Sequence, residues 1–477
     1  MIEGLKPYAE YKESGVPWLG KIPKHWQALP NRTLFAEVKD RNHPDEPLLS
    51  VTIAKGIIRQ SDLLANSSKK DSSNEDKTKY KLVQPRDIAY NKMRAWQGAV
   101  GVSNYRGIVS PAYIVVRPRG EQNTEYFHYL LRTPAFAKEA ERWSYGITSD
   151  QWSLRAQDFK QIYCSLPPKE EQDCIVKFIA HKDRRISRFI HNKRRLIELL
   201  NEQKQAIIHR AVTRGLDLNV RLKPSGVEWL GDVPEHWSVL RVKQCAKTIS
   251  KGTTPSTEGR EILENGTIRF LKAENINNGK ITNKPLCFID EETHNILKRS
   301  QLKVNDILFV IAGATLGKIA VIQGNLLPAN TNQAVSFVRP NNRVLPEYLA
   351  MWLQSSRVKE LIWLNAVQSA QPNLSMADLG NFLMPLPPKK EQSDILGWLD
   401  AHLAALNSSI DSAHREISLI REYRTRLISD VVTGKLDVRS MKLPAMDETE
   451  TLEDIDNGED TEAQELIESE EVADADE

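Results

Sequence analysis

The sequence contains few cysteines and no long apolar run. Its four cysteines, Cys164, Cys174, Cys245 and Cys287, form no Cys-x-x-Cys pair among 477 residues, which excludes a disulfide framework and a zinc ribbon. No apolar stretch reaches the roughly 18 residues that a membrane span requires, and the first residues lack the apolar core of a signal peptide. We therefore expect a cytoplasmic protein that does not associate with a membrane.

Motifs that carry catalysis are also missing. The segment 313–318 resembles a phosphate-binding loop, but only three residues separate its glycines, and Ile319 stands where a magnesium-binding Ser or Thr is required. The sequence has no GxSxG, no GxGxxG after a strand, no HExxH and no Asn/Asp-Pro-Pro-Tyr/Phe tetrapeptide. We therefore predict that the chain is not an enzyme and holds no metal or cofactor of its own.

The overall charge conceals an asymmetry. Lys and Arg number 65 and Asp and Glu number 63, which gives a formal charge of +2. Sixteen of the acidic residues lie in 447–477, where there is no Lys or Arg, so the preceding 446 residues carry 65 basic and 47 acidic side chains, a net +18. Such a body favours a polyanionic partner, although a basic surface that serves only solubility is the alternative. The dense charge and lack of aromatics in 438–477 predict a disordered acidic tail.

The sequence repeats itself once over most of its length. Residues 14–26, SGVPWLGKIPKHW, recur at 225–237 as SGVEWLGDVPEHW with nine identities, and LPPKEEQ at 166–172 recurs at 386–392 as LPPKKEQ. A period this long indicates two copies of domain size and not a solenoid.

The segments between these markers differ between the two copies. Apolar and β-branched runs at 108–116 and 307–311 indicate strands, separated by Gly, Asn and Pro. Weak sequence matches between the two segments, called echoes below, predict one α+β scaffold in both copies. The alternative, that the segments are unrelated inserts between similar ends, stays open. The echoes are Asp87-Ile88 with Asp306-Ile307, Arg117-Pro118 with Arg339-Pro340, and Tyr126 with Tyr348.

A long helix is predicted after each Leu-Pro-Pro. Proline suits the first helical position, and the acidic residues that follow it are favoured by the helix dipole. Apolar residues then recur at alternating steps of four and three without an internal proline, which is typical of a coiled coil. Because each apolar stripe needs a partner, two copies related by a two-fold axis should pair their helices antiparallel. The predicted interface residues are Ile179, Ile186, Phe189, Leu196, Leu200, Leu399, Leu406, Ile417 and Ile420.

Several basic and polar residues are candidates for contacts with nucleic acid. Arg and Lys recognise guanine edges and phosphates, while Asn and Gln recognise adenine. In the first helix, a run between 181 and 195 has a net charge of +6; it either contacts phosphates or is a solvated flank of the coiled coil. The loop candidates are individually consistent with ordinary surface loops as well. The candidates are Lys92, Arg94 and Gln97 in the first copy, Arg184, Arg185 and Arg188 in the first helix, and Lys251, Thr254, Lys272 and Asn275 in the second copy.

The doubled Ser-Gly-Val-x-Trp-Leu-Gly-x-x-Pro-x-His-Trp and the doubled Leu-Pro-Pro-x-x-Glu-Gln resemble the specificity subunit of type I restriction-modification enzymes. The resemblance covers about residues 11 to 437. It implies a mixed α+β fold with a pseudo-two-fold internal repeat, in which two long antiparallel coiled-coil helices separate two α/β target recognition domains. The expected parts are a first recognition domain at 1–167, a first helix at 168–213, a second recognition domain at 214–386, a second helix at 387–437 and the acidic tail at 438–477.

The resemblance also implies a function. Each recognition domain would read one half of a split, asymmetric target on double-stranded DNA, and the helices would set the spacer and recruit two modification subunits and the restriction subunits. S-adenosylmethionine, ATP and magnesium would be bound by those partners, which carry out adenine methylation and ATP-dependent cleavage. The alternative is a coiled-coil scaffold or interaction protein with non-specific affinity for nucleic acid. A fused nuclease would need a carboxylate set that the sequence does not reveal.

Overall fold

The chain divides into two compact units. The computed structural model describes residues 5–64, 76–146, 152–277, 279–313, 315–366 and 373–441, so the acidic segment 447–477 lies outside the described residues. One unit comprises Met1–Arg195 with Ala413–Glu477, and the other comprises Leu196–Ser412. Both boundaries fall inside long helices, so each unit contains part of both.

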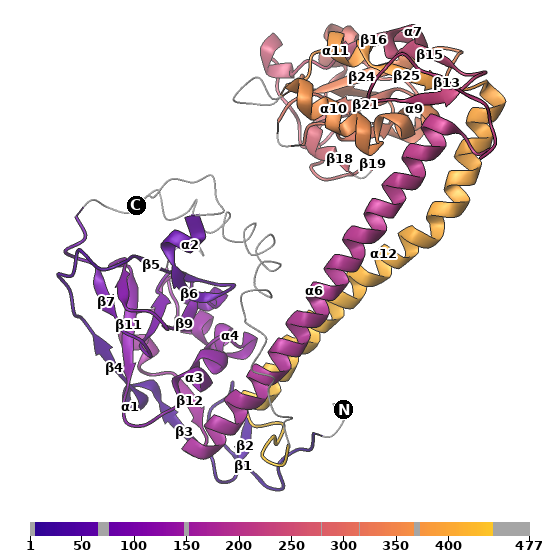
Figure 1. The fold of residues 1–477 in the computed structure, drawn as a ribbon. Helices are drawn as coiled ribbons and strands as arrows, with labels where there is room; N and C mark the ends of the chain where they lie inside the picture. The colour runs from indigo at the N-terminus through magenta and orange to yellow at the C-terminus, as the bar shows by residue number, and fades with distance from the viewer. Residues whose placement is uncertain are drawn as a thin grey trace. The chain divides into compact units, whose positions relative to one another are not determined.

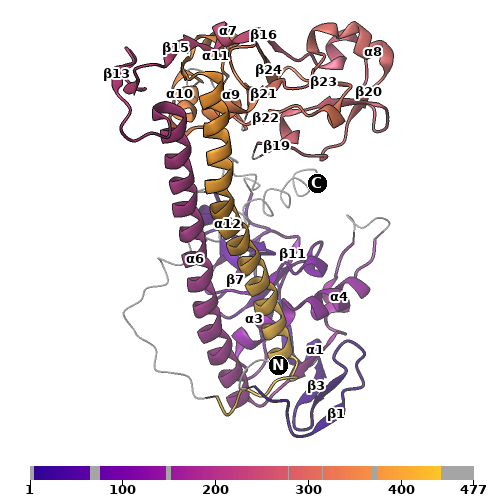
Figure 2. The same cartoon turned by 90° about the vertical axis from the view of Figure 1, so that its right-hand side faces the viewer.

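Two long helices, α6 (Lys169–Arg214) and α12 (Lys389–Val432), run antiparallel to each other (Figures 1 and 2). In the first unit, Arg424 Nε donates to Asp183 Oδ1 at 3.0 Å, and Lys193 Nζ lies 2.8 Å from Glu416 Oε2. In the second unit, Lys204 Nζ donates to Asn407 Oδ1 at 2.7 Å. The predicted antiparallel helix pair is therefore confirmed.

The buried stripe of helix α6 follows an 11-residue period. Phe189 and Leu196, which were predicted to lie on this stripe, are 39% and 41% exposed, whereas the adjacent Ile190 and Ile197 are 2% and 9% exposed. An 11-residue period corresponds to about 3.67 residues per turn, so the buried stripe departs after Ile186 from the predicted stripe of 3.5 residues per turn. The isoleucines spaced by eleven residues, each 9% exposed or less, are Ile175, Ile186, Ile197 and Ile208.

The other predicted helix-interface residues divide by burial. Ile179 and Ile186 of α6 are buried, as are Leu399 and Ile417 of α12. The rest are half-buried, namely Leu200, Leu406 and Ile420.

Each unit contains a four-stranded antiparallel sheet with the same strand order. The order is β4-β11-β8-β9 in the first unit and β16-β24-β21-β22 in the second. The copies therefore share one α+β scaffold, as predicted, and are not unrelated inserts between similar ends. The strands are β4 (Phe35–Val38), β8 (Ile88–Asn91), β9 (Val100–Val102) and β11 (Tyr113–Pro118), then β16 (Ala246–Lys251), β21 (Ile307–Val310), β22 (Ile319–Val321) and β24 (Val335–Pro340).

Each unit also contains smaller sheets and short helices. In the first unit the pairs are β1 (Tyr11–Glu13) with β2 (Lys21–Pro23), β3 (Gln27–Pro30) with β12 (Tyr163–Leu166), β5 (Leu49–Thr52) with β6 (Gly56–Arg59), and β7 (Lys81–Val83) with β10 (Gly107–Val109); its helices are α1 (Asn31–Leu34), α2 (Gln60–Leu64), α3 (Thr124–Leu131), α4 (Pro134–Arg142) and α5 (Ala156–Phe159). In the second unit β13 (Leu222–Pro224) pairs with β14 (Asp232–Pro234), β15 (Ser238–Arg241) with β25 (Leu383–Leu386), and β18 (Ile276–Asn277) with β19 (Lys280–Ile281), while β17 (Ile268–Leu271) lies between β20 (Phe288–Ile289) and β23 (Ala329–Thr331). Its helices are α7 (Val242–Cys245), α8 (Glu291–Ile296), α9 (Pro346–Leu353), α10 (Ser356–Ala366) and α11 (Met376–Asn381).

The Asp-Ile and Arg-Pro echoes form the same ion pair in each sheet. Arg117 Nε and Nη2 donate to the two oxygens of Asp87 at 2.7 and 2.8 Å. Arg339 binds Asp306 in the same way at 2.8 and 2.7 Å. The carboxylates are 1% and 0% exposed. A buried carboxylate is costly unless it is paired and hydrogen-bonded, and in each copy this arginine supplies that partner.

Candidate nucleic-acid interface

The doubled sequence motifs meet at the start of each long helix. Glu171 Oε1 accepts a hydrogen bond from Trp26 Nε1 at 3.0 Å, and Glu171 Oε2 lies 2.7 Å from His25 Nε2. The second copy repeats both contacts, at 3.0 and 2.8 Å, between Glu391 and the pair Trp237 and His236. The motifs therefore form a structural joint between a domain and the first turn of its helix.

A tyrosine in each domain binds the last turn of the helix from the other copy. The Tyr126 hydroxyl donates to the carbonyl of Val432 at 2.9 Å, and the Tyr348 hydroxyl donates to the carbonyl of Val212 at 3.0 Å. Both hydroxyls are buried, where an unpaired polar group would be costly. Each domain thus holds the start of its own helix and the end of the other one.

The loops that differ between the copies lie at one end of each four-stranded sheet. In the first unit the chain leaves β8 at Asn91 and begins β11 at Tyr113, and these two residues are paired across the ladder. In the second unit Lys251 at the end of β16 is paired with Ser336 of β24, and Val310 at the end of β21 with Val335. The Asp–Arg pairs lie at the opposite end of each sheet, so the variable end is separate from these conserved contacts.

Three predicted DNA contacts lie together in the loop between β8 and β9. Lys92 and Arg94 are half-buried and Gln97 is exposed. Trp96 Nε1 donates to the carbonyl of Met93 at 2.8 Å, which fixes the loop. The loop therefore presents two cations and an amide from a constrained backbone.

Additional cations lie around this loop. They were not predicted from the sequence. Arg41 and Lys81 form an isolated backbone bridge, and the Lys81 ammonium donates to the carbonyl of Tyr113. Burial and the nearby cations, Arg41 first and Lys92 next, lower the pKa of Lys81. Lys39 and Arg41 follow β4 at the same end of the sheet, and the signal that could have revealed them is this position directly after a strand.

Three predicted contacts of the second copy also converge. The Thr253 amide donates to the carbonyl of Thr331 at 3.0 Å, and the Thr331 hydroxyl donates to the carbonyl of Leu271 at 2.9 Å. These bonds bring the segments after β16, β17 and β23 together. Gly252 permits the approach, because a Cβ at this position would lie 2.0 Å from the Thr331 oxygen. The segments carry Lys251, Thr254 and Lys272, of which the first is exposed and the others half-buried.

Asn275 was predicted to contact DNA, and the structure corrects this assignment. Its side chain is 0% exposed. The amide nitrogen donates to the carbonyls of Thr282 at 3.1 Å and Pro285 at 2.7 Å, and the amide oxygen accepts from the backbone of Lys272 at 2.9 Å. Asn275 therefore shapes the loop that carries Lys272 and presents no atom to a base.

The predicted helix arginines lie on the solvent-exposed side of their helix. Arg184, Arg185 and Arg188 are exposed on helix α6. In the same run, Lys193 pairs with Glu416, and Lys182 lies 5.6 Å from the centre of the Phe178 ring.

The sequence that resembles a phosphate-binding loop lies where the first unit has its loop between β8 and β9. Gly317 precedes β22 with a φ of 84°, as Gly98 precedes β9 with a φ of 95°. The Leu374 amide donates to the carbonyl of Ile311 at 2.8 Å, and the Leu154 amide donates to the carbonyl of Lys92 at the same distance. The segments 92–98 and 311–317 are thus structural equivalents, which the sequence interpretation missed.

Comparison with known proteins gives this arrangement a family. The family model described as "Type I restriction modification DNA specificity domain" matches residues 31–199 and 234–413. The chain belongs to this family. It is a DNA specificity subunit of a type I restriction-modification system, and this family is not known to be catalytic itself.

Individual relatives agree with the family assignment. The specificity subunit MjaVIII of Methanocaldococcus jannaschii is 27% identical over 341 residues, which cover 70% of this chain and 76% of that one. The putative MjaX specificity subunit of the same organism is 23% identical over 444 residues, covering 88% and 96%. The Escherichia coli EcoBI specificity subunit is 24% identical over 325 residues, covering 66% of each chain.

A solved structure shares the fold of this specificity subunit. It comes from work entitled "Structural basis underlying complex assembly and conformational transition of the type I R-M system", with a TM-score of 0.59 at 14% identity, covering 86% of this chain and 98% of that one. Within the described ranges, no cluster of three or more His, Cys, Asp or Glu side chains could hold a metal ion. Across the same part of the chain, no helix has the length and apolar character needed to cross a membrane.

Proposed function

We propose that this specificity subunit binds double-stranded DNA through the variable ends of its two sheets, and that each domain reads one half of a split, asymmetric target. The observation that carries this proposal is the pairing of one shared scaffold with two different sets of basic and polar loops at the equivalent sheet end. Arg, Lys and Gln are side chains that read base edges, and a different set in each copy would read a different half-site.

The long helices would set the number of unread base pairs between the half-sites. Their buried stripes keep α6 and α12 paired over many turns, and such a pair resists bending. The similar joints at the helix starts would recruit two modification subunits, because repeated surfaces suit two copies of one partner. These subunits and the restriction subunits would bind S-adenosylmethionine, ATP and magnesium and carry out the chemistry.

The proposed contacts fall into two groups. Lys92, Arg94 and Gln97 would serve the first half-site, and Lys251, Thr254 and Lys272 the second. Arg184, Arg185 and Arg188 on α6 would contribute only phosphate contacts, which add salt-sensitive affinity without sequence preference.

Selection from a random duplex pool tests the proposal. The full chain, with and without its modification subunits, is incubated with the pool at fixed salt, and bound DNA is sequenced. Enrichment of two short blocks separated by a constant gap is the expected result. Bound DNA without any enriched sequence would favour the scaffold alternative, and Mg²⁺-dependent cleavage by the chain alone would favour a nuclease.

Arg94→Ala should weaken recognition of the first half-site only. Loss of a bidentate base contact costs about 1–3 kcal/mol, roughly 5- to 150-fold in affinity. Affinities for duplexes that vary in one half-site at a time measure the effect, with the exposed Lys12→Ala as the control. Unchanged discrimination at both half-sites would remove Arg94 from the reading surface.

Removing one turn from both helices should change the preferred spacer. Deletion of 198–201 from α6 together with 408–411 from α12 shortens the pair by about 5–6 Å, comparable to one or two base pairs at 3.4 Å each. The selection described above, repeated on this variant, reports the gap. The same two blocks with an unaltered gap would contradict a ruler function of the helices.

A further inference from the structure

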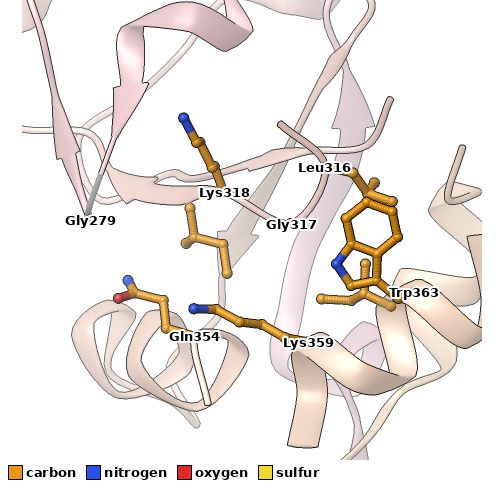
Figure 3. A pocket seen from close by; sticks show the side chains of 9 residues that line it. Gly279, Leu316, Gly317, Lys318, Gln354, Lys359 and Trp363 are labelled. Atoms are coloured by element: carbon orange, nitrogen blue, oxygen red, sulfur yellow. The ribbon is translucent and has the colours of Figure 1, made fainter. Parts of the chain in front are cut away.

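A hollow of about 230 Å³ lies in the second unit, beside the loop that ends at Gly317. Figure 3 shows the Lys359 side chain extending toward that of Gln354, with the Trp363 ring farther along the same helix, α10. Lys318 lies on the rim, with its side chain extending away from Lys359 in Figure 3, and Leu316, Ile319 and Ile362 also line the hollow. The hollow thus has one lysine on its wall and a second on its rim, beside an amide and apolar side chains.

The corresponding place in the first unit is filled by an arginine. Arg132 directly follows α3, as Gln354 directly follows α9. The guanidinium of Arg132 donates to the carbonyls of Val100 at 2.8 Å and of Ile53 and Ala54 at 2.7 Å. The shorter Gln354 leaves this space open in the second unit.

Both lysines of the hollow are alanines in the first unit. Lys359 is the fourth residue of α10, and Ala137 is the fourth residue of α4. Lys318 follows Gly317, and Ala99 follows Gly98, the two glycines with left-handed backbone before the fourth strand. Where the first unit has one internal cation, the second unit therefore has two lysines that line an open space.

The two ammonium groups have no acceptor among the described residues, and a further cation stands near them. Partial burial, and then the charge of Lys204, lower the pKa of Lys359. The nearest acidic residue in α10 is engaged elsewhere, because Glu360 accepts from Arg357 at 2.8 Å. A group of like charges without a counter-ion is relieved when an anion binds between them.

We propose that this hollow holds a backbone phosphate of bound DNA next to the second half-site, between Lys318 and Lys359. The amide of Gln354 would donate to the same phosphate, and the apolar wall of Leu316, Ile319 and Trp363 would pack against the neighbouring deoxyribose. The site lies beside the loop equivalent to 92–98, so a duplex that meets the reading loops would bring its backbone to it. This inference rests on the proposed function only for its location beside the half-site.

The expected effect of removing both charges follows from counter-ion release. Lys318→Gln with Lys359→Gln should reduce the affinity of the full chain for duplex DNA about 10-fold and lower the slope of log K against log salt by about 1–2. The control is Lys247→Gln with Lys303→Gln, which removes two exposed lysines at the opposite end of the same sheet. It should leave both quantities unchanged.

Neutral methylphosphonate linkages locate the phosphate. One linkage near the second half-site should weaken binding of the unaltered chain and have no additional effect on the Lys318→Gln, Lys359→Gln chain. Equal sensitivity of both chains at every linkage would overturn the site while sequence-specific binding stands. If the unaltered chain shows no sequence preference but the double variant loses affinity for a random duplex, the half-site proposal fails and the phosphate site stands.

Inorganic phosphate distinguishes a free anion from DNA as the occupant. Acetylation of Lys359 at limiting reagent, read by mass spectrometry, should be suppressed by duplex DNA at micromolar concentration and not by millimolar phosphate. Protection by phosphate alone, with none by DNA, would overturn the assignment to a DNA backbone.

Discussion

Ile190→Asp should unfold this specificity subunit, whereas Phe189→Asp should leave it folded. Ile190 is 2% exposed within helix α6, and its neighbour Phe189 is 39% exposed. An aspartate at the buried position loses the burial of an isoleucine and places an unpaired charge in the helix pair, which together cost about 4 kcal/mol or more. At Phe189, where the side chain already meets water, the cost should be about 1 kcal/mol or less.

Urea denaturation followed by circular dichroism at 222 nm measures both variants. Adjacent positions carry the same new side chain, so helix propensity and the added charge are matched between them. If Phe189→Asp were the more damaging variant, the buried stripe would follow the 3.5-residue repeat after all. Two further single variants, Ile197→Asp and Leu196→Asp, repeat the comparison two helical turns later.

Arg339→Ala should destabilise the second unit by about 3–5 kcal/mol. Asp306 is 0% exposed, and the two hydrogen bonds of Arg339 at 2.8 and 2.7 Å balance its charge. Without the guanidinium the carboxylate stays buried beside a single backbone donor, the Lys303 amide at 2.8 Å. The carboxylate must then either take up a proton or admit water into the sheet end.

Two comparisons make this result specific. Arg357→Ala removes an arginine with a similar 2.8 Å bond to Glu360, but both partners are 57% exposed, so the change should be within about 0.5 kcal/mol. The double change of Arg339→Ala with Asp306→Ala should recover part of the lost stability, because it also removes the unpaired charge. An Arg339→Ala chain as stable as the Arg357→Ala chain would show that this ion pair is dispensable.

The sequence predicts the architecture well because its strongest signals are structural. The Trp and the Glu that recur in the doubled motifs hydrogen-bond to each other in both copies. Their repetition in the sequence therefore reflects a contact that both copies form. The faint Asp and Arg echoes have the same origin, since a buried ion pair tolerates little change on either side. Residues with such strict geometric roles stay recognisable where the surrounding loops differ.

The register of the helix stripe was not predicted correctly from the sequence. Positions 189 and 190 are both apolar, as are 196 and 197, so hydrophobicity alone does not choose between a 3.5-residue and a 3.67-residue period. The choice depends on the partner helix. The spacing of four isoleucines by eleven residues was the available signal.

The loops that we propose to read DNA were only partly predictable for a different reason. Lys92, Arg94 and Gln97 are neighbours in sequence, so their loop could be recognised directly. In the second copy, Lys251 and Lys272 come together through β16, β17 and β23, a convergence that requires the fold. Asn275 was misassigned because its amide is used within its own turn, and composition does not distinguish an internal hydrogen bond from a free donor.

The hydrogen bond between Tyr126 and Val432 has a consequence for synthesis on the ribosome. The core of the first unit includes Leu427, Val431 and Val438, so this unit lacks part of its interior until the described chain is almost complete. The second unit, Leu196–Ser412, is continuous in sequence and has all its residues earlier. The domain that is translated first is therefore the last to complete its core. A chain that stops near residue 412 would expose the apolar interior of its N-terminal domain.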